Sequence, residues 1–146
     1  MTDLRVHPPR RWNESLAGFI WLPRLIDKVR AFQAGTLGAY AYPSALDRAF
    51  MRRFQLTPAF LEQAVREQAT EVEIGTTVLQ QVQLPAEEIH GRCMEMERKY
   101  HMAFCILDHD DGYVPGLGYP VPRFLQPHIW RWYQGWAARK ASVRKL

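Results

Sequence analysis

Four helix-start signals follow one another in the middle of the chain, and they constrain the fold more than any other sequence feature. The signals are two capping boxes and two first-turn prolines: Ser44 with Asp47, Thr70 with Glu73, Thr57-Pro58 and Pro85. Each is a combination that starts a helix by satisfying or removing an unpaired backbone N–H. Apolar residues recur at helical spacing after each signal. After Pro85, the i,i+4 pairs Glu88–Arg92 and Glu95–Lys99 support the helix. The sequence therefore predicts successive helices between residue 44 and about residue 100.

A further helix is predicted near residues 23–34. Pro23 suits a first helical turn and Gly35 suits a helix end. One face carries apolar residues at helical spacing. The other face carries the charged residues Arg24, Asp27, Lys28 and Arg30.

The remaining segments have weaker patterns. Residues 1–11 are predicted to form an arm, because Pro8 and Pro9 disfavour a helix. Residues 12–21 have one apolar side and are assigned to a helix that Gly18 weakens. Residues 101–113 are expected to form a short strand or a partly buried loop. Residues 113–146 are predicted to be a proline-rich crossing followed by a basic aromatic helix.

Together these assignments predict one all-α domain over residues 1–146. It would be compact and contain five or six helices with irregular, proline-rich connections, which 146 residues suffice to build. The chain has no apolar run long enough to span a membrane. It starts without the apolar stretch of a secretory signal and has only two cysteines. We therefore expect a cytoplasmic protein with no membrane association.

The charge is unevenly distributed. Residues 112–146 contain six lysines and arginines and no acidic residue, whereas residues 62–111 are strongly acidic. In the basic C-terminal helix, Trp132, Tyr133 and Trp136 share a stripe with Ile129. A mixture of tryptophan and arginine can bind single-stranded nucleic acid. Burial of the aromatic stripe in the core is the favoured interpretation, because buried aromatic residues contribute strongly to core packing. Nucleic-acid binding is accordingly kept only as an alternative.

Metal and cofactor sites are not expected. His101, Cys105 and His109 would share a face on a continuous helix and could ligate zinc. The apolar residues between them favour a strand or loop, in which they would not converge, and the short paired spacings of zinc motifs are missing. The acidic segment ending in Asp111-Gly112 departs from the calcium-loop pattern and predicts a turn. No nucleotide-binding glycine motif or nucleophile motif occurs in the sequence, and Cys93 lies on an apolar helical stripe.

The segment 21–47 has the most promising combination for binding. Arg24 and Lys28 lie one turn apart on the predicted helix, and glycines at 35 and 38 allow the chain to turn back toward them. The predicted ligand-binding residues are Arg24, Asp27, Lys28, Tyr40, Tyr42 and Asp47. Cations beside tyrosine hydroxyls suit a small phosphate or carboxylate. The alternative is an exposed Arg24–Asp27 ion pair, with tyrosines that pack on the core.

The same segment, WLPRLIDKVRAFQAGTLGAYAYPSALD, resembles the signature stretch of a bacterial family known as domain of unknown function 5069. The leading DLRVHPPRRW and the predicted helices to about residue 82 are similar to the family layout. LDHDDG at 107–112 is similar to its late acidic segment. The resemblance implies a small helical cytosolic protein and implies no activity. Residues 113–146 differ from the usual family ending.

These observations predict a non-catalytic binding protein for a small anionic ligand or for a protein partner, which includes a second copy of the chain. One alternative is a small enzyme that acts on an anionic metabolite. Asp27 or Asp47 would then be the general base and Arg24 would hold the anion. Nucleic-acid binding through the C-terminal helix is another alternative.

Overall fold

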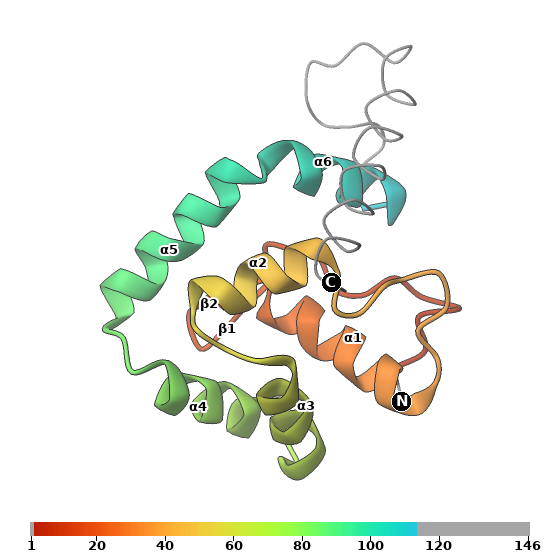
Figure 1. The fold of residues 1–146 in the computed structure, drawn as a ribbon. Helices are drawn as coiled ribbons and strands as arrows, with labels where there is room; N and C mark the ends of the chain where they lie inside the picture. Colours follow the sequence, from red (N-terminus) through yellow and green to blue (C-terminus); the bar gives the residue numbers. More distant parts are fainter. Residues whose placement is uncertain (1, 114–146) are drawn as a thin grey trace, which may run out of the picture. The chain divides into compact units, whose positions relative to one another are not determined.

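The computed structural model describes residues 2–113, and this part of the chain is mostly helical (Figure 1). Within residues 2–113, six helices follow one small antiparallel hairpin. The predicted all-α class is therefore confirmed, with the hairpin as an addition. The chain divides into two compact units, residues 1–96 and 97–146. The prediction of one domain over 1–146 stays a prediction.

The helices of the first unit begin where the sequence predicts. They are α1 (Leu22–Ala34), α2 (Ala45–Arg53), α3 (Pro58–Glu67), α4 (Glu71–Val82) and most of α5 (Ala86–Lys99). Ser44 and Thr70 each form the predicted capping box, and the Thr57 hydroxyl accepts a hydrogen bond from the Phe60 N–H. Gly35 ends α1 in the left-handed conformation. Short-range capping chemistry therefore decides where these helices start and stop.

The helix assigned to residues 12–21 is wrong. The chain forms the hairpin β1 (Ser15–Leu16) and β2 (Phe19–Ile20), in which Ser15 faces Ile20 and Leu16 faces Phe19. Ala17 and Gly18 join the strands with φ of 53° and 88°. Positive φ at both central residues is the geometry of a tight type I′ hairpin turn, and Gly18 adopts it without a steric cost. The glycine that weakened the helix assignment marks the turn.

The core of the first unit surrounds α1. Leu22, Leu25, Ile26 and Val29 have no exposed surface. Helix α1 packs against α3 and β1, and α2 lies on its other side in Figure 1. The predicted arm is not helical over residues 2–11, and it is attached to the loop that follows α1. Its Leu4 N–H donates to the carbonyl oxygen of Thr36 at 3.0 Å, and the Leu4 side chain is buried.

The second unit corrects another prediction. Residues His101–Asp110 form helix α6 and neither a strand nor a loop. Ala103, Phe104 and Ile106 are buried on this helix. A short run that is apolar on several sides does not distinguish a helix from a strand by periodicity. The predicted crossing and basic helix, with Trp132, Tyr133 and Trp136, lie almost entirely outside the described residues.

No helix in the described range is long and apolar enough to cross a membrane.

Candidate functional site

Three of the four charged residues on α1 are covered by other segments of the first unit, and Arg30 is partly exposed. Arg24, Asp27 and Lys28 are all buried, with 2%, 8% and 3% of their surface exposed. The alternative of an exposed Arg24–Asp27 ion pair is therefore wrong. The charged side chains are covered because the N-terminal arm and the start of α2 pack on this face. The helical periodicity of the α1 sequence could not show that these distant segments would pack on its charged face.

Lys28 and Asp47 form an ion pair between α1 and α2. The Lys28 ammonium also donates to the Ser44 hydroxyl at 3.1 Å. Asp47 is fully buried, and it accepts from the Trp21 indole N–H at 3.0 Å and from the Ser44 backbone N–H at 2.8 Å. A carboxylate with three donors and no exposed surface holds its neighbours in place. In this geometry it is a poor candidate for a general base, which must reach a substrate proton.

Asp27 is bound to the N-terminal arm. Its carboxylate accepts from the Arg10 backbone N–H at 2.8 Å and from the Arg10 guanidinium at 2.9 Å. The same guanidinium reaches Glu71 on α4 at 2.6 Å, and Arg30 donates to Glu71 at 2.8 Å. Burial would lower the pKa of Arg10, but the hydrogen bonds and charges of Glu71 and Asp27 outweigh it and raise the pKa. The Arg10 hydrogen bond in turn lowers the pKa of Glu71. This network ties the arm to α1 and α4.

Arg24 has an aromatic environment. Its guanidinium carbon lies 5.4 Å from the centre of the Trp21 ring and 5.9 Å from the centre of the Tyr40 ring. Its Nη1 donates to the Arg10 carbonyl oxygen at 3.1 Å. The structure thus brings Arg24 and Tyr40 together, as the sequence predicted, but in a buried place.

Tyr42 has other partners. Its hydroxyl donates to Glu62 on α3 at 3.3 Å, and its ring packs on Phe32 with centres 5.1 Å apart. Burial, and then the negative charge of Glu62, raise the pKa of Tyr42. The six predicted residues therefore contact neighbours throughout the first unit. None of the contacts described for them forms an open anion pocket.

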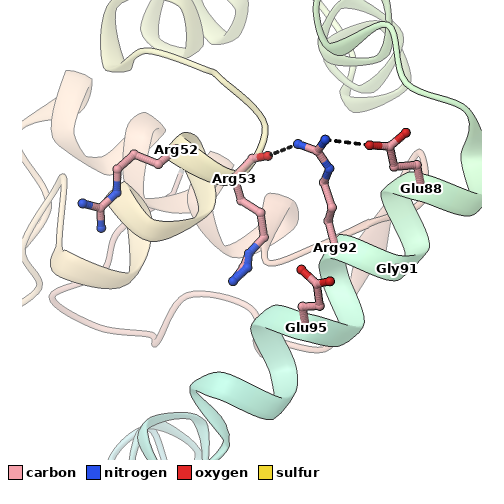
Figure 2. A pocket seen from close by; sticks show the side chains of 6 residues that line it. All are labelled: Arg52, Arg53, Glu88, Gly91, Arg92 and Glu95. Carbon is pink, nitrogen blue, oxygen red and sulfur yellow. Dashed lines mark hydrogen bonds and ion pairs between the residues drawn. The ribbon is translucent and has the colours of Figure 1, made fainter.

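An open groove of about 580 Å³ lies elsewhere in the first unit, between the end of α2 and the middle of α5 (Figure 2). Six residues line it: Arg52, Arg53, Glu88, Gly91, Arg92 and Glu95. Its volume is in the range of small-molecule sites. The groove is charged, with three arginines and two glutamates, and it differs from the mostly apolar lining that is usual for such sites.

Arg92 holds the two walls of the groove together. Its Nη1 donates to the Arg53 carbonyl oxygen at 2.7 Å, and its Nη2 donates to Glu88 at 2.6 Å. The first bond satisfies a carbonyl at the C-terminal end of α2, where a helix lacks backbone donors and favours a positive charge. Of the two pairs predicted one turn apart on α5, Glu88–Arg92 is confirmed. The predicted Glu95–Lys99 pair does not form among the described residues. Arg92 therefore connects α5 to the end of α2 and also lines the groove.

Arg53 and Glu95 differ from Arg92 in their side-chain contacts. Figure 2 shows both side chains extending into the space between α2 and α5, while the Arg52 guanidinium points to the outer side. Among the described residues, neither the Arg52 nor the Arg53 guanidinium makes an ion pair or hydrogen bond, and the Glu95 carboxylate makes none.

Sequence reasoning did not identify this groove. It recognised Glu88 and Arg92 as a surface pair only, and it did not consider Arg52 and Arg53 as site residues. Two signals were present: adjacent arginines at the end of a predicted helix, and Gly91 in the middle of another. Nothing in the sequence indicates that these two places are adjacent.

The histidines and cysteines do not form a metal site within the described residues. The Cys105 Sγ lies 3.7 Å from the His101 Nε2, one turn apart on α6. No group of three or more potential ligands converges in the part of the chain that the structure describes. Cys93 is buried as predicted, and burial raises the pKa of its thiol.

The chain belongs to the family described as domain of unknown function (DUF5069), whose sequence model matches residues 6–103. The match confirms the resemblance drawn from residues 21–47, and it includes the six residues of the groove. It ends before the LDHDDG segment at 107–112. No curated protein matches the chain significantly.

Proposed function

We propose that this member of the DUF5069 family is a non-catalytic binding protein for a small anionic ligand, which it holds in the groove between α2 and α5. The observation that carries the proposal is the accumulation of three arginines in one groove, two of them without an ion-pair partner among the described residues. Guanidinium groups hold carboxylates and phosphates through two parallel hydrogen bonds.

The proposal gives the charged face of α1 a supporting role. Asp47 holds the first turn of α2 against α1, and the last turn of the same helix carries Arg52 and Arg53. The six residues predicted from the sequence as ligand contacts would then position the helix that carries the cations. Both cysteines are free thiols, which supports the cytoplasmic location that belongs to this proposal.

The test is calorimetric titration of the protein with inorganic phosphate and with ethyl phosphate. Arg53→Ala is expected to weaken binding about ten- to a hundredfold, because a charge-assisted contact contributes about 1.5–3 kcal/mol. Arg53→Lys should restore only part of the affinity, since an ammonium cannot reproduce the planar fork.

Arg66→Ala is the matched control. Arg66 is exposed and lies in the last turn of α3, as Arg53 lies in the last turn of α2. The Arg66→Ala change removes the same charge outside the groove, and the affinity should stay within about twofold of that of the unmodified protein. Equal weakening by both variants would show that only net charge matters. That result, or the absence of saturable binding to the unmodified protein, would refute the proposed function.

A further inference from the structure

Among the described residues, the groove contains an acidic side chain without a partner, Glu95, as well as two arginines without one. Arg53 and Glu95 come from different helices, line the same groove and extend into the same space (Figure 2). They do not form an ion pair with each other in the described structure. A plain anion would satisfy Arg53 but would be repelled by Glu95. A ligand that carries both charges would satisfy the two side chains together.

Gly91 supports the presence of a ligand body between these charges. It lies in the middle of α5 and is exposed, and a glycine in a helix interior is less favourable than alanine. Apart from its chain neighbours and its own helix backbone, no atom of the described residues lies within 4 Å of the position that a Cβ would occupy at Gly91. Neither close packing nor a positive φ therefore explains the glycine. Its missing side chain does leave the floor of the groove open beside Arg92 and Glu95.

The other charges of the groove leave Glu95 available. Glu88 is occupied by Arg92, and Arg92 is held by Glu88 and by the Arg53 carbonyl oxygen. Arg52 extends the positive end of the groove toward its outer side (Figure 2). The groove thus has a positive end on α2 and a negative group on α5, with open helix backbone between them.

On the basis of the proposed function, we infer that the ligand is zwitterionic: its anionic group binds Arg53, its ammonium group binds Glu95, and its body lies over Gly91. This assigns Glu95 as a specificity residue that selects amino-substituted anions over plain ones. The ligand class is that of small aminoalkyl phosphates and amino acids.

The experiment compares two probes of nearly equal size, 2-aminoethyl phosphate and ethyl phosphate. The full chain is expected to bind the amino compound about tenfold more tightly, the effect of one charge-assisted hydrogen bond in a partly solvated place. Glu95→Gln should remove this preference by weakening 2-aminoethyl phosphate about tenfold. Ethyl phosphate should bind the variant as tightly as before or more tightly, because the repulsion is gone.

Two further variants complete the test. Glu87→Gln removes the same charge from the same helix outside the groove and should keep the preference. Gly91→Leu leaves every charge in place but fills the floor, and it should weaken both probes. Circular dichroism would confirm that each variant is folded.

The possible failures are distinguishable. If ethyl phosphate binds in an Arg53-dependent way but the full chain shows no preference for the amino compound, the zwitterion inference is wrong and the proposed function stands. The same holds if Glu95→Gln changes both affinities equally. If neither probe binds the full chain, both the inference and the proposed function are refuted.

Discussion

The charged face of α1 and the groove between α2 and α5 contain the same kinds of residue in opposite environments. On α1, Lys28 is buried and paired with Asp47, and Asp27 is enclosed by Arg10. In the groove, Arg53 and Glu95 are accessible and have no ion-pair partner among the described residues. A charge enclosed with its partners contributes to the fold, and a charge left open is available for binding. The difference predicts that changes in the first region affect stability and changes in the second affect affinity.

The largest effect is expected for Asp47→Asn. The variant leaves the Lys28 ammonium buried without its counter-charge, and breaking a buried ion pair in this way costs about 3–5 kcal/mol. The free energy of unfolding, measured by urea denaturation, should fall by that amount. Asp3→Asn is the control, because Asp3 pairs with Arg5 at the surface and its loss should have a much smaller effect. Equal losses in the two variants would contradict the comparison.

A smaller loss of stability is expected for Arg10→Ala. The change leaves Asp27 and Glu71 without their shared guanidinium, although the Arg10 backbone N–H still bonds Asp27. Since the Arg10 side chain is partly exposed, we expect a loss of about 1.5–3 kcal/mol in the free energy of unfolding. Arg5→Ala provides a matched change in the same arm. If both variants unfold alike, the arm is not held by this network.

In the groove, by contrast, a substitution is expected to raise the stability of the protein and to lower its affinity for the ligand. Gly91→Ala should raise the free energy of unfolding by about 0.5–1 kcal/mol, because alanine is the better helix former and its methyl group meets no neighbour. The same variant should weaken 2-aminoethyl phosphate. Thermal unfolding and titration of one preparation measure both quantities. A stabilised variant with unchanged affinity would show that the open floor has no part in binding.

The smallest effect concerns acid pH. Hydrogen bonds from Arg10, and then from Arg30, hold the pKa of Glu71 below its ordinary value of 4.5. A carboxyl with a lowered pKa in the folded state stabilises the fold above its ordinary pKa, and this contribution disappears as the pH falls through the folded value. The urea concentration at the midpoint of unfolding should therefore decrease as the pH is lowered below 4.5. The decrease should be less steep in Glu71→Gln. Asp3, whose pKa is lowered to about 2, extends the decline in both proteins. Parallel profiles would mean that Glu71 does not titrate differently in the two states.

Sequence reasoning was accurate where a structure depends on near neighbours. The capping boxes at Ser44 and Thr70 and the start at Thr57-Pro58 were predicted with their residues, as was the Glu88–Arg92 pair. It failed at residues 12–21 and 101–110, where short apolar segments fit a helix and a strand equally well. Turn geometry at Ala17 and Gly18 decided the first case.

The sequence by itself determined the family and the boundaries of most helices, because caps and helix ends join residues within about one turn. It also showed that α1 carries three cations and one acid, Asp27. Only the tertiary structure decided which charges are enclosed and which are open. Arg10 meets Glu71 from 61 positions away, Lys28 meets Asp47 from 19, and Arg92 meets the carbonyl of Arg53 from 39. Charge type is a property of the residue, but burial and partner are properties of the packed elements. That packing is the reason why we propose the groove between α2 and α5 as the binding site, in place of the charged face of α1.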